Sequence, residues 1–219
     1  MTISLFGEFD NAGRDQEDLP SGWEEARKVT SILVDAATPK DGYTAEHAVE
    51  VARLSRLVGM DLGLSEEELE ALAQGALLHD LGKLGVVDAI LEKSVPLTAG
   101  EWAAVKRHPE IGACMIEPIE SLSGAVPVVR HHHERPDGTG YPDGLEGEQI
   151  PLAARIVAVA DAYDVMLRGR LHQPKRYRRK RSPAEAIQEL IREAGRQFDM
   201  RVVEAIRRVL EDAKGHTSR

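Results

Sequence analysis

The sequence has little of what builds disulfide-rich, zinc–thiolate or membrane-spanning proteins. Its single cysteine, Cys114, excludes an internal disulfide framework and a cysteine-rich zinc site. Cys114 lies in the apolar run GACMI, so we interpret it as a small buried thiol without a role. No apolar run approaches the roughly 20 residues that a transmembrane helix needs. We therefore expect no membrane association.

Export signals and excess positive charge are also missing. The N-terminus has no basic start followed by a long apolar stretch, so we expect a cytoplasmic protein. The formal net charge of −9 argues against nucleic acid as a partner. One basic run, KRYRRKR at residues 175–181, interrupts this acidic chain. It is either a solvated loop or a lip that attracts phosphate.

Sustained alternation of apolar and polar residues, typical of half-buried strands, is absent as well. Apolar residues recur at three- and four-residue spacing, which predicts an all-α fold. Capping boxes mark three helix starts, at Ser65 with Glu68, Thr98 with Glu101, and Ser182 with Glu185. The expected helices cover residues 22–38, 44–61, 65–79, 98–116, 120–132, 151–168, 183–195 and 199–213.

The length suits one domain, which we place at residues 22–214 after a polar tail or linker at 1–21. From residue 134 to residue 151 the sequence ERPDGTGYPDGLEGEQIP is dense in Gly, Pro and Asp, which predicts a long loop. Long structured loops in compact domains are often functional.

Histidine and aspartate carry the chemistry. His79 and Asp80 close an apolar helix just before Gly82, so both side chains can leave the helix end towards one point. Asp161 lies in the apolar run RIVAVADAYD, and a buried carboxylate needs a metal or another partner. Imidazoles and carboxylates suit divalent first-row metals. The candidate ligands are His47, His79, Asp80, His108, His132, His133 and Asp161.

This set is too large for one ion that keeps open positions, and it suits two ions bridged by one carboxylate, for which Asp80 is the candidate. A two-metal centre would hold a phosphodiester between the ions and turn a bridging water into hydroxide. It would also stabilise the attacking and leaving oxygens of an in-line displacement. The residues therefore predict hydrolysis of a phosphodiester.

The order of these residues resembles the HD superfamily of metal-dependent phosphohydrolases. The matching segments are His47, HDLGK at 79–83, His108, HHE at 132–134 and Asp161. The run DGTGYP at 137–142 narrows the resemblance to HD-GYP domain phosphodiesterases. The resemblance covers roughly residues 30–210, and the ordered set is highly specific.

The resemblance implies an HD-type helical bundle with additional C-terminal helices that hydrolyses cyclic di-GMP to pGpG or GMP in bacterial signalling. Family members with three metals carry a Glu four residues before the first His, where this chain has Tyr43. Two divalent ions are therefore expected, iron or manganese first, with nickel, cobalt or zinc as alternatives.

The resemblance also implies roles around the metals. Lys83 is expected near the substrate phosphate, with Asp137 helping to hold it; a purely structural salt bridge is the alternative for Lys83. With Asp80, these residues form the expected catalytic set. Gly140 and Tyr141 are expected to shape the loop, with Tyr141 closing over a nucleobase.

After Asp161 the chain departs from the family, whose members usually continue with a Thr-Ser pair and then a basic residue, Pro and Tyr. Here the sequence reads VMLRGRLHQPKRYRRKRS. Arg170 stands where an arginine that contacts the substrate is expected. Counting back from Ser182 instead aligns Lys175 with the basic residue.

Three functions stay open at this stage. The first is an active cyclic di-GMP phosphodiesterase. The second keeps the metals but acts on cyclic GMP-AMP or another nucleotide. The third is a weakly active sensor or interaction module that binds the dinucleotide or a protein partner; a homodimer is equally open.

Overall fold

The computed structural model describes residues 23–37, 45–93, 95–169 and 180–216. Within these ranges the chain forms helices and no β-strand, which confirms the predicted all-α fold. The α-helices are α1 (Trp23–Ala37), α2 (Ala45–Asp61), α3 (Glu66–Leu78), α4 (Asp88–Leu91), α5 (Ala99–Val105), α6 (His108–Ile116), α7 (Val126–His131), α8 (Leu152–Arg168), α9 (Pro183–Glu193) and α10 (Met200–His216). Short 3-10 helices are η2 (Leu81–Gly85), η3 (Glu120–Ala125) and η4 (Gly147–Gln149).

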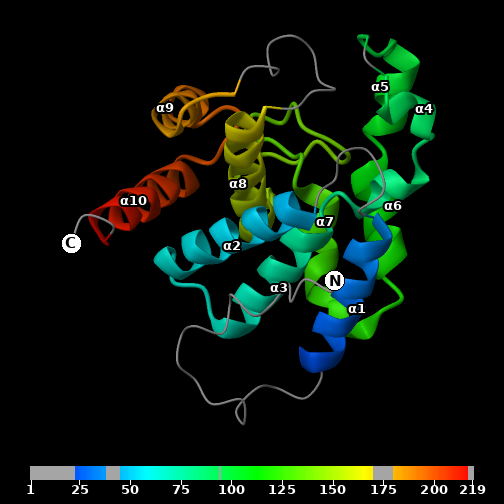
Figure 1. Ribbon diagram of the computed structural model, residues 1–219, viewed down its shortest axis with the longest axis horizontal. Helices are drawn as coiled ribbons and strands as arrows, with labels where there is room; N and C mark the ends of the chain where they lie inside the picture. The colour runs from blue at the N-terminus through cyan, green and yellow to red at the C-terminus, as the bar shows by residue number, and fades with distance from the viewer. Residues whose placement is uncertain (1–22, 38–44, 94, 170–179, 217–219) are drawn as a thin grey trace.

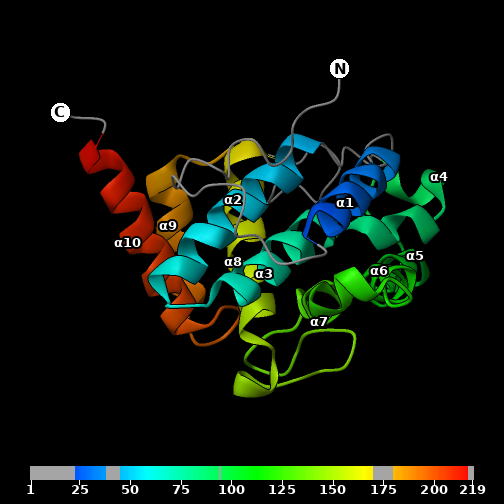
Figure 2. The ribbon, with the colours of Figure 1, turned by 90° about the horizontal axis from the view of Figure 1, so that it is seen from below.

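Helix α8 runs through the middle of the molecule, where it contacts α2, α3, α7, α9 and α10. Helices α9 and α10 lie at one end, and α4 and α5 lie at the other (Figures 1 and 2). One cluster of buried apolar side chains joins α1, α2, α3, α7, α8, α9 and α10, including Leu54, Leu77, Val129, Ile156 and Ile206. Burial of this apolar surface, at about 25 cal/mol per Å², is the main term that holds α8 against its neighbours.

The three capping boxes are all formed. In each, the hydroxyl of the first residue accepts a hydrogen bond from the backbone N–H three residues later, and the glutamate carboxylate accepts one from the backbone N–H of the first residue. They stand at the starts of α3, α5 and α9. Local hydrogen-bonding chemistry therefore fixes these helix starts as the sequence indicated.

The prediction of one helix over residues 98–116 is wrong, because the chain breaks into α5 and α6. Pro109 causes the break: it lacks an N–H, and its ring would clash with the carbonyl of Val105 in a continuous helix. That carbonyl lies 2.8 Å from Nδ1 of His108 instead. Pro127 likewise begins α7, so the helix predicted over 120–132 is η3 followed by α7.

Cys114 corrects a second expectation, since it is exposed rather than buried. On α6 Ala113 and Ile116 are buried, whereas position 114 faces outward. As for membranes, no helix in the described part of the chain is both long enough and apolar enough to span a bilayer.

Candidate metal centre

The His-Asp pair lies where α3 gives way to η2. His79 and Asp80 are both buried. Gly82 lets η2 pass directly over the start of α6, because a β-carbon at this position would overlap the carbonyl oxygen of His108. The glycine of HDLGK therefore brings the His-Asp pair next to His108.

Three imidazole rings are anchored to carbonyl groups near helix ends. In each, Nδ1 lies 2.7 to 2.8 Å from the carbonyl oxygen three residues earlier; the pairs are His79 with Ala76, His108 with Val105, and His132 with Val129. The last carbonyls of a helix lack intrahelical donors, so a ring N–H satisfies them. With the proton on Nδ1, the lone pair of each Nε2 is the one available to a metal.

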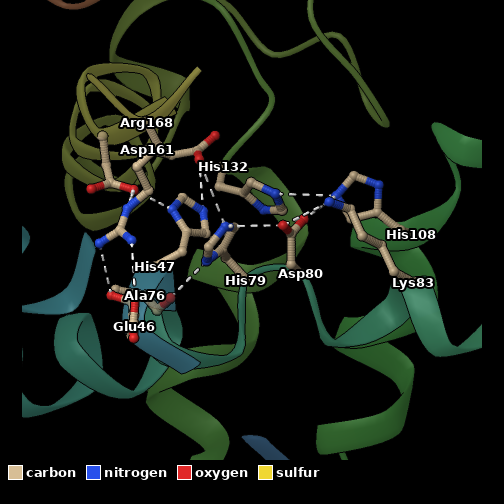
Figure 3. A network of polar contacts seen from close by, with 11 residues as sticks. Glu46, His47, Ala76, His79, Asp80, Lys83, His108, His132, Asp161 and Arg168 are labelled. Atoms are coloured by element: carbon tan, nitrogen blue, oxygen red, sulfur yellow. Dashed lines mark hydrogen bonds and ion pairs between the residues drawn. The ribbon is translucent and has the colours of Figure 1, made fainter. Parts of the chain in front are cut away.

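These Nε2 atoms converge on Asp80, as Figure 3 shows. Nε2 of His79 lies 3.5 Å from Oδ2 of Asp80, and Nε2 of His108 lies 3.4 Å from Oδ1. Nε2 of His132 lies 3.3 Å from Nε2 of His108. The three rings and the Asp80 carboxylate thus lie close together.

Two donor groups with ligand atoms within 4.8 Å of one another meet at this carboxylate. One consists of Asp80, His108, His132 and His133, and the other of His47, His79 and Asp80. Asp80 belongs to both, which is the geometry expected of a bridging carboxylate. Asp161 lies beside the second group, with Oδ1 3.2 Å from Nε2 of His47 and 3.9 Å from Nε2 of His79.

His47 is held by a side chain that the sequence analysis missed. Its Nδ1 lies 2.6 Å from Oδ2 of Asp164, a buried residue on α8. Oδ2 of Asp164 also accepts a hydrogen bond of 2.7 Å from Nε of Arg168. A carboxylate behind a metal-binding imidazole fixes its tautomer and raises its basicity. The signal was present, because Asp164 follows Asp161 by three positions on the same helix face.

Lys83 contacts the shared carboxylate directly, with Nζ 2.7 Å from Oδ2 of Asp80. Burial by itself would raise the pKa of Asp80, but the charge of Lys83 and the neighbouring imidazoles hold this pKa well below its usual range. Asp80 is therefore an anion at neutral pH. It carries the negative charge that a divalent cation requires.

The imidazoles of His108, His132 and His133 are neutral. Burial lowers the pKa of His108 to about 3 and that of His133 to about 4, from an ordinary value of 6.5. Burial also places the pKa of His132 well below that value. Neutral imidazole and ionised carboxylate are the forms that bind metals. The clusters can therefore bind divalent metal, and their donor set suits a first-row ion.

Glu134, the glutamate of HHE, organises the loop that follows. Its buried carboxylate accepts hydrogen bonds from the backbone N–H groups of Asp143, Gly144 and Leu145, at 2.6, 3.0 and 3.1 Å. Sequence reasoning gave this glutamate no role of its own. It holds residues 143–145 of the loop close to the end of α7. The loop has no regular structure other than η4.

Of the two expected loop residues, Tyr141 lies beside the candidate metal centre. Gly140 packs against the backbone of Glu134 and Arg135, where a β-carbon would lie 2.5 Å from the nitrogen of Arg135. The ring of Tyr141 lies 4.9 Å from that of His133 and 5.6 Å from Nζ of Lys106. Tyr141 thus lies next to one donor group, while the loop-shaping role expected of Gly140 and Tyr141 stays a prediction.

Asp137 accepts hydrogen bonds from Arg135 and Thr139, whereas the carboxylate found on Lys83 is that of Asp80. Arg135 in particular holds the pKa of Asp137 below its usual range. The expected support of Lys83 by Asp137 stays a prediction. Tyr43, Arg170 and Lys175 lie outside the described residues.

The family is settled by a match of the HD-domain family model to residues 28–202. The chain belongs to the HD-domain family. Its resemblance to the HD-GYP group within that family, based on the motif DGTGYP at 137–142, is confirmed.

Among the curated relatives of this HD-domain chain is a cyclic di-GMP phosphodiesterase response regulator of Xanthomonas campestris, 41% identical over 188 residues, or 84% of this chain and 48% of the relative. A cyclic di-GMP phosphodiesterase of Pseudomonas aeruginosa is 41% identical over 75% of this chain and 39% of its own length. The chain thus spans less than half of either relative. A 3'3'-cGAMP-specific phosphodiesterase of Vibrio cholerae is 39% identical over 61% of this chain and 28% of its length.

Two solved structures share the HD-type fold. The HDG"Y"P protein of Bdellovibrio bacteriovorus has a TM-score of 0.60 and 18% identity, covering 90% of this chain and 75% of its own. A cyclic GMP-AMP-specific phosphodiesterase of Vibrio cholerae has a TM-score of 0.62 and 23% identity, covering 85% of this chain and 49% of its own. The HD-type helical arrangement is therefore shared across low sequence identity.

Proposed function

We propose that residues 22–214 form a metal-dependent phosphodiesterase domain that hydrolyses cyclic di-GMP to pGpG or GMP. The observation that carries the proposal is Asp80, an ionised carboxylate common to two groups of metal-binding donors. The relatives from Xanthomonas and Pseudomonas are both named as cyclic di-GMP phosphodiesterases, which supports the choice of substrate.

We propose two divalent ions, iron or manganese first, with nickel, cobalt or zinc as alternatives. One would be held by His47, His79, Asp80 and Asp161, and the other by Asp80, His108, His132 and His133. Divalent ions at these positions would supply Lewis acidity to the phosphodiester and lower the pKa of water. Two separate donor groups with one shared carboxylate support the number of ions.

The chain's own residues then bind and orient the substrate. Lys83 is a buried ammonium group 2.7 Å from the shared carboxylate, and it can offset the charge of a phosphate entering beside Asp80. Tyr141, whose ring lies against His133, offers an aromatic face to a nucleobase at the edge of the donor groups. Arg170 and Lys175 are proposed to contact the substrate, and Asp137 to assist Lys83.

The test combines metal analysis with product analysis. Protein purified without oxygen is expected to contain close to two ions per chain, and to convert cyclic di-GMP to pGpG or GMP on chromatography. Asp80→Ala, checked for folding by circular dichroism, serves as the matched inactive control. Metal-loaded wild-type protein that leaves cyclic di-GMP intact over hours would instead favour the sensor function.

A second candidate substrate is 3'3'-cGAMP. The relative named as specific for it is nearly as similar, at 39% identity over its matched residues. This chain also departs from its family in the segment after Asp161, where substrate contacts are expected. Rates on equal concentrations of cyclic di-GMP, 3'3'-cGAMP and cyclic di-AMP decide between the two. Turnover of cyclic di-GMP alone would remove the second candidate.

A further inference from the structure

Arg168, the last residue of α8, links two elements behind the metal centre (Figure 3). Its Nε donates to Oδ2 of Asp164 at 2.7 Å, and its Nη2 donates to the backbone carbonyl of Glu46 at 3.3 Å. Its Nη1 lies 3.5 Å from Oε2 of Glu46. One planar guanidinium therefore contacts α8 and the first turn of α2 together.

Both of these contacts lead to His47. Glu46 directly precedes His47 in the chain, so the bond to its carbonyl fixes the backbone beside the ligand. Asp164 accepts the 2.6 Å hydrogen bond of the His47 ring through the same Oδ2 that Arg168 contacts. The guanidinium thus restrains the imidazole from the backbone side and from the ring side.

The Asp164 carboxylate, which lies between Arg168 and His47, is the part of this arrangement that depends most on Arg168. The side chain of Asp164 is only 4% exposed, so it depends on protein donors rather than water. Without Arg168 the Asp164 carboxylate would still accept the hydrogen bond from the His47 ring, but it would lose its charged donor. It could then rotate about its side-chain bonds, and the ring of His47 would follow. Because Arg168 is 39% exposed, water screens part of this effect.

We propose that Arg168 is a positioning residue, which sets the orientation of His47 and thereby the affinity of the ion held by His47, His79 and Asp161. The proposal rests on the metal centre of the proposed function. It assigns a role to a residue in the segment where this chain departs from the usual Thr-Ser pair. The contacts of Arg168 with Asp164 and Glu46, which we call the clamp, are therefore a feature of this chain's own sequence.

The test is calorimetric titration of the metal-free full chain with Mn²⁺. Arg168→Met is expected to weaken one binding step by about threefold to tenfold, less than the 10- to 100-fold typical of a direct partner of a ligand. The other step, at His108, His132 and His133, should not change. Arg168→Lys should restore part of the affinity, because an ammonium can bond Asp164 but cannot bridge to Glu46 in the same fork geometry.

Arg155→Met is the matched control. Arg155 lies on the same helix, and its Nη1 is 2.6 Å from Oδ2 of Asp199, in an ion pair remote from His47 in sequence. This variant is expected to lower the melting temperature while leaving both Mn²⁺ affinities unchanged. It separates general loosening of α8 from misplacement of His47. If Arg168→Met does not fold, the comparison between wild type and Arg168→Lys still measures the clamp.

Three results would overturn the proposal: unchanged Mn²⁺ affinities with a lowered melting temperature, equal weakening of both steps, or no Mn²⁺ binding by the wild type. The first two would leave Arg168 as a structural tie and the proposed function intact. A wild type that binds two Mn²⁺ ions and loses one step in Arg168→Met, but does not cleave cyclic di-GMP, would support the clamp and refute the proposed function.

Discussion

His108 and His132, on one side of the candidate metal centre, are held by main-chain carbonyl groups, whereas His47 on the other side is held by the side chain of Asp164. A carbonyl acceptor follows from the helix ends themselves and cannot be removed by substitution. A carboxylate acceptor depends on the packing of α2 against α8 and on Arg168. The comparison teaches that the His47 side is the one that sequence change can tune.

Asp80→Ala is expected to have the largest effect, because it breaks both sides at once. The variant should lose Mn²⁺ affinity by more than about 100-fold, since even indirect partners of metal ligands cost 10- to 100-fold. Hydrolysis of cyclic di-GMP should fall to background. Metal analysis and product chromatography measure the two losses. Asp88→Ala, which removes an exposed carboxylate on α4, is the control. Retention of two ions by Asp80→Ala would show that Asp80 is not shared by two metal sites.

Lowering the pH is expected to reduce the free energy of unfolding of the metal-free protein through His108 and His133. His108 and His133 have a pKa of about 3 and about 4 in the folded chain, but an ordinary value near 6.5 once unfolded. The unfolded chain therefore binds more protons below pH 6.5, so the free energy of unfolding falls as the pH drops from 6.5 towards 4. Each group contributes up to about 1.4 kcal/mol per pH unit in this window.

Urea denaturation of metal-free protein at pH 7, 6 and 5 measures this loss. His108→Gln cannot titrate, so its free energy of unfolding should fall less steeply with pH than that of the wild type, whatever its value at pH 7. Equal slopes for the two proteins would mean that His108 takes up a proton in the folded state as readily as in the unfolded chain. The burial argument for this side would then fail.

Asp164→Asn is expected to weaken the opposite side selectively. The variant keeps the shape of the side chain, but its amide nitrogen can donate to Nδ1 of His47 and place the ring proton on Nε2, where the metal should bind. One Mn²⁺ step should weaken by about 10- to 100-fold. Imidazole ¹⁵N shifts in the metal-free protein report the tautomer. Asp199→Asn, at the ion pair with Arg155, is the matched control and should leave both steps unchanged.

How far the sequence predicts this site follows from the range of the interactions involved. The capping box at Ser65 and the position of His79 and Asp80 at a helix end depend on residues a few positions apart, so local patterns predict them. The contact of His47 with Asp164 joins residues 117 positions apart. The spacing of Asp164 from Asp161 makes Asp164 a candidate, but its pairing with His47 exists only once α2 packs on α8, and no local pattern predicts that pairing.

Of the two wrong predictions, only one could have been avoided with an elementary rule. Pro109 stands in HPEIG, and a proline inside a helical pattern ends or bends the helix, so the separation of α5 from α6 could have been predicted. The exposure of Cys114 depended on which face of α6 meets the core, and an apolar run of five residues does not define a face. The same break at Pro109 places His108 in the site.

Arg135→Ala is expected to have the smallest effect, because its ion pair with Asp137 belongs to neither side of the centre. Its guanidinium lies 2.6 Å from that carboxylate, but the two side chains are 29% and 25% exposed. An ion pair so accessible to water contributes about 1 kcal/mol or less. Thermal unfolding should shift slightly, and both Mn²⁺ affinities should remain those of the wild type. A loss of either Mn²⁺ step would show that the loop carrying Arg135 and Asp137 also supports the candidate metal centre. The comparison of the His47 side with the His108 side would then have to include this loop.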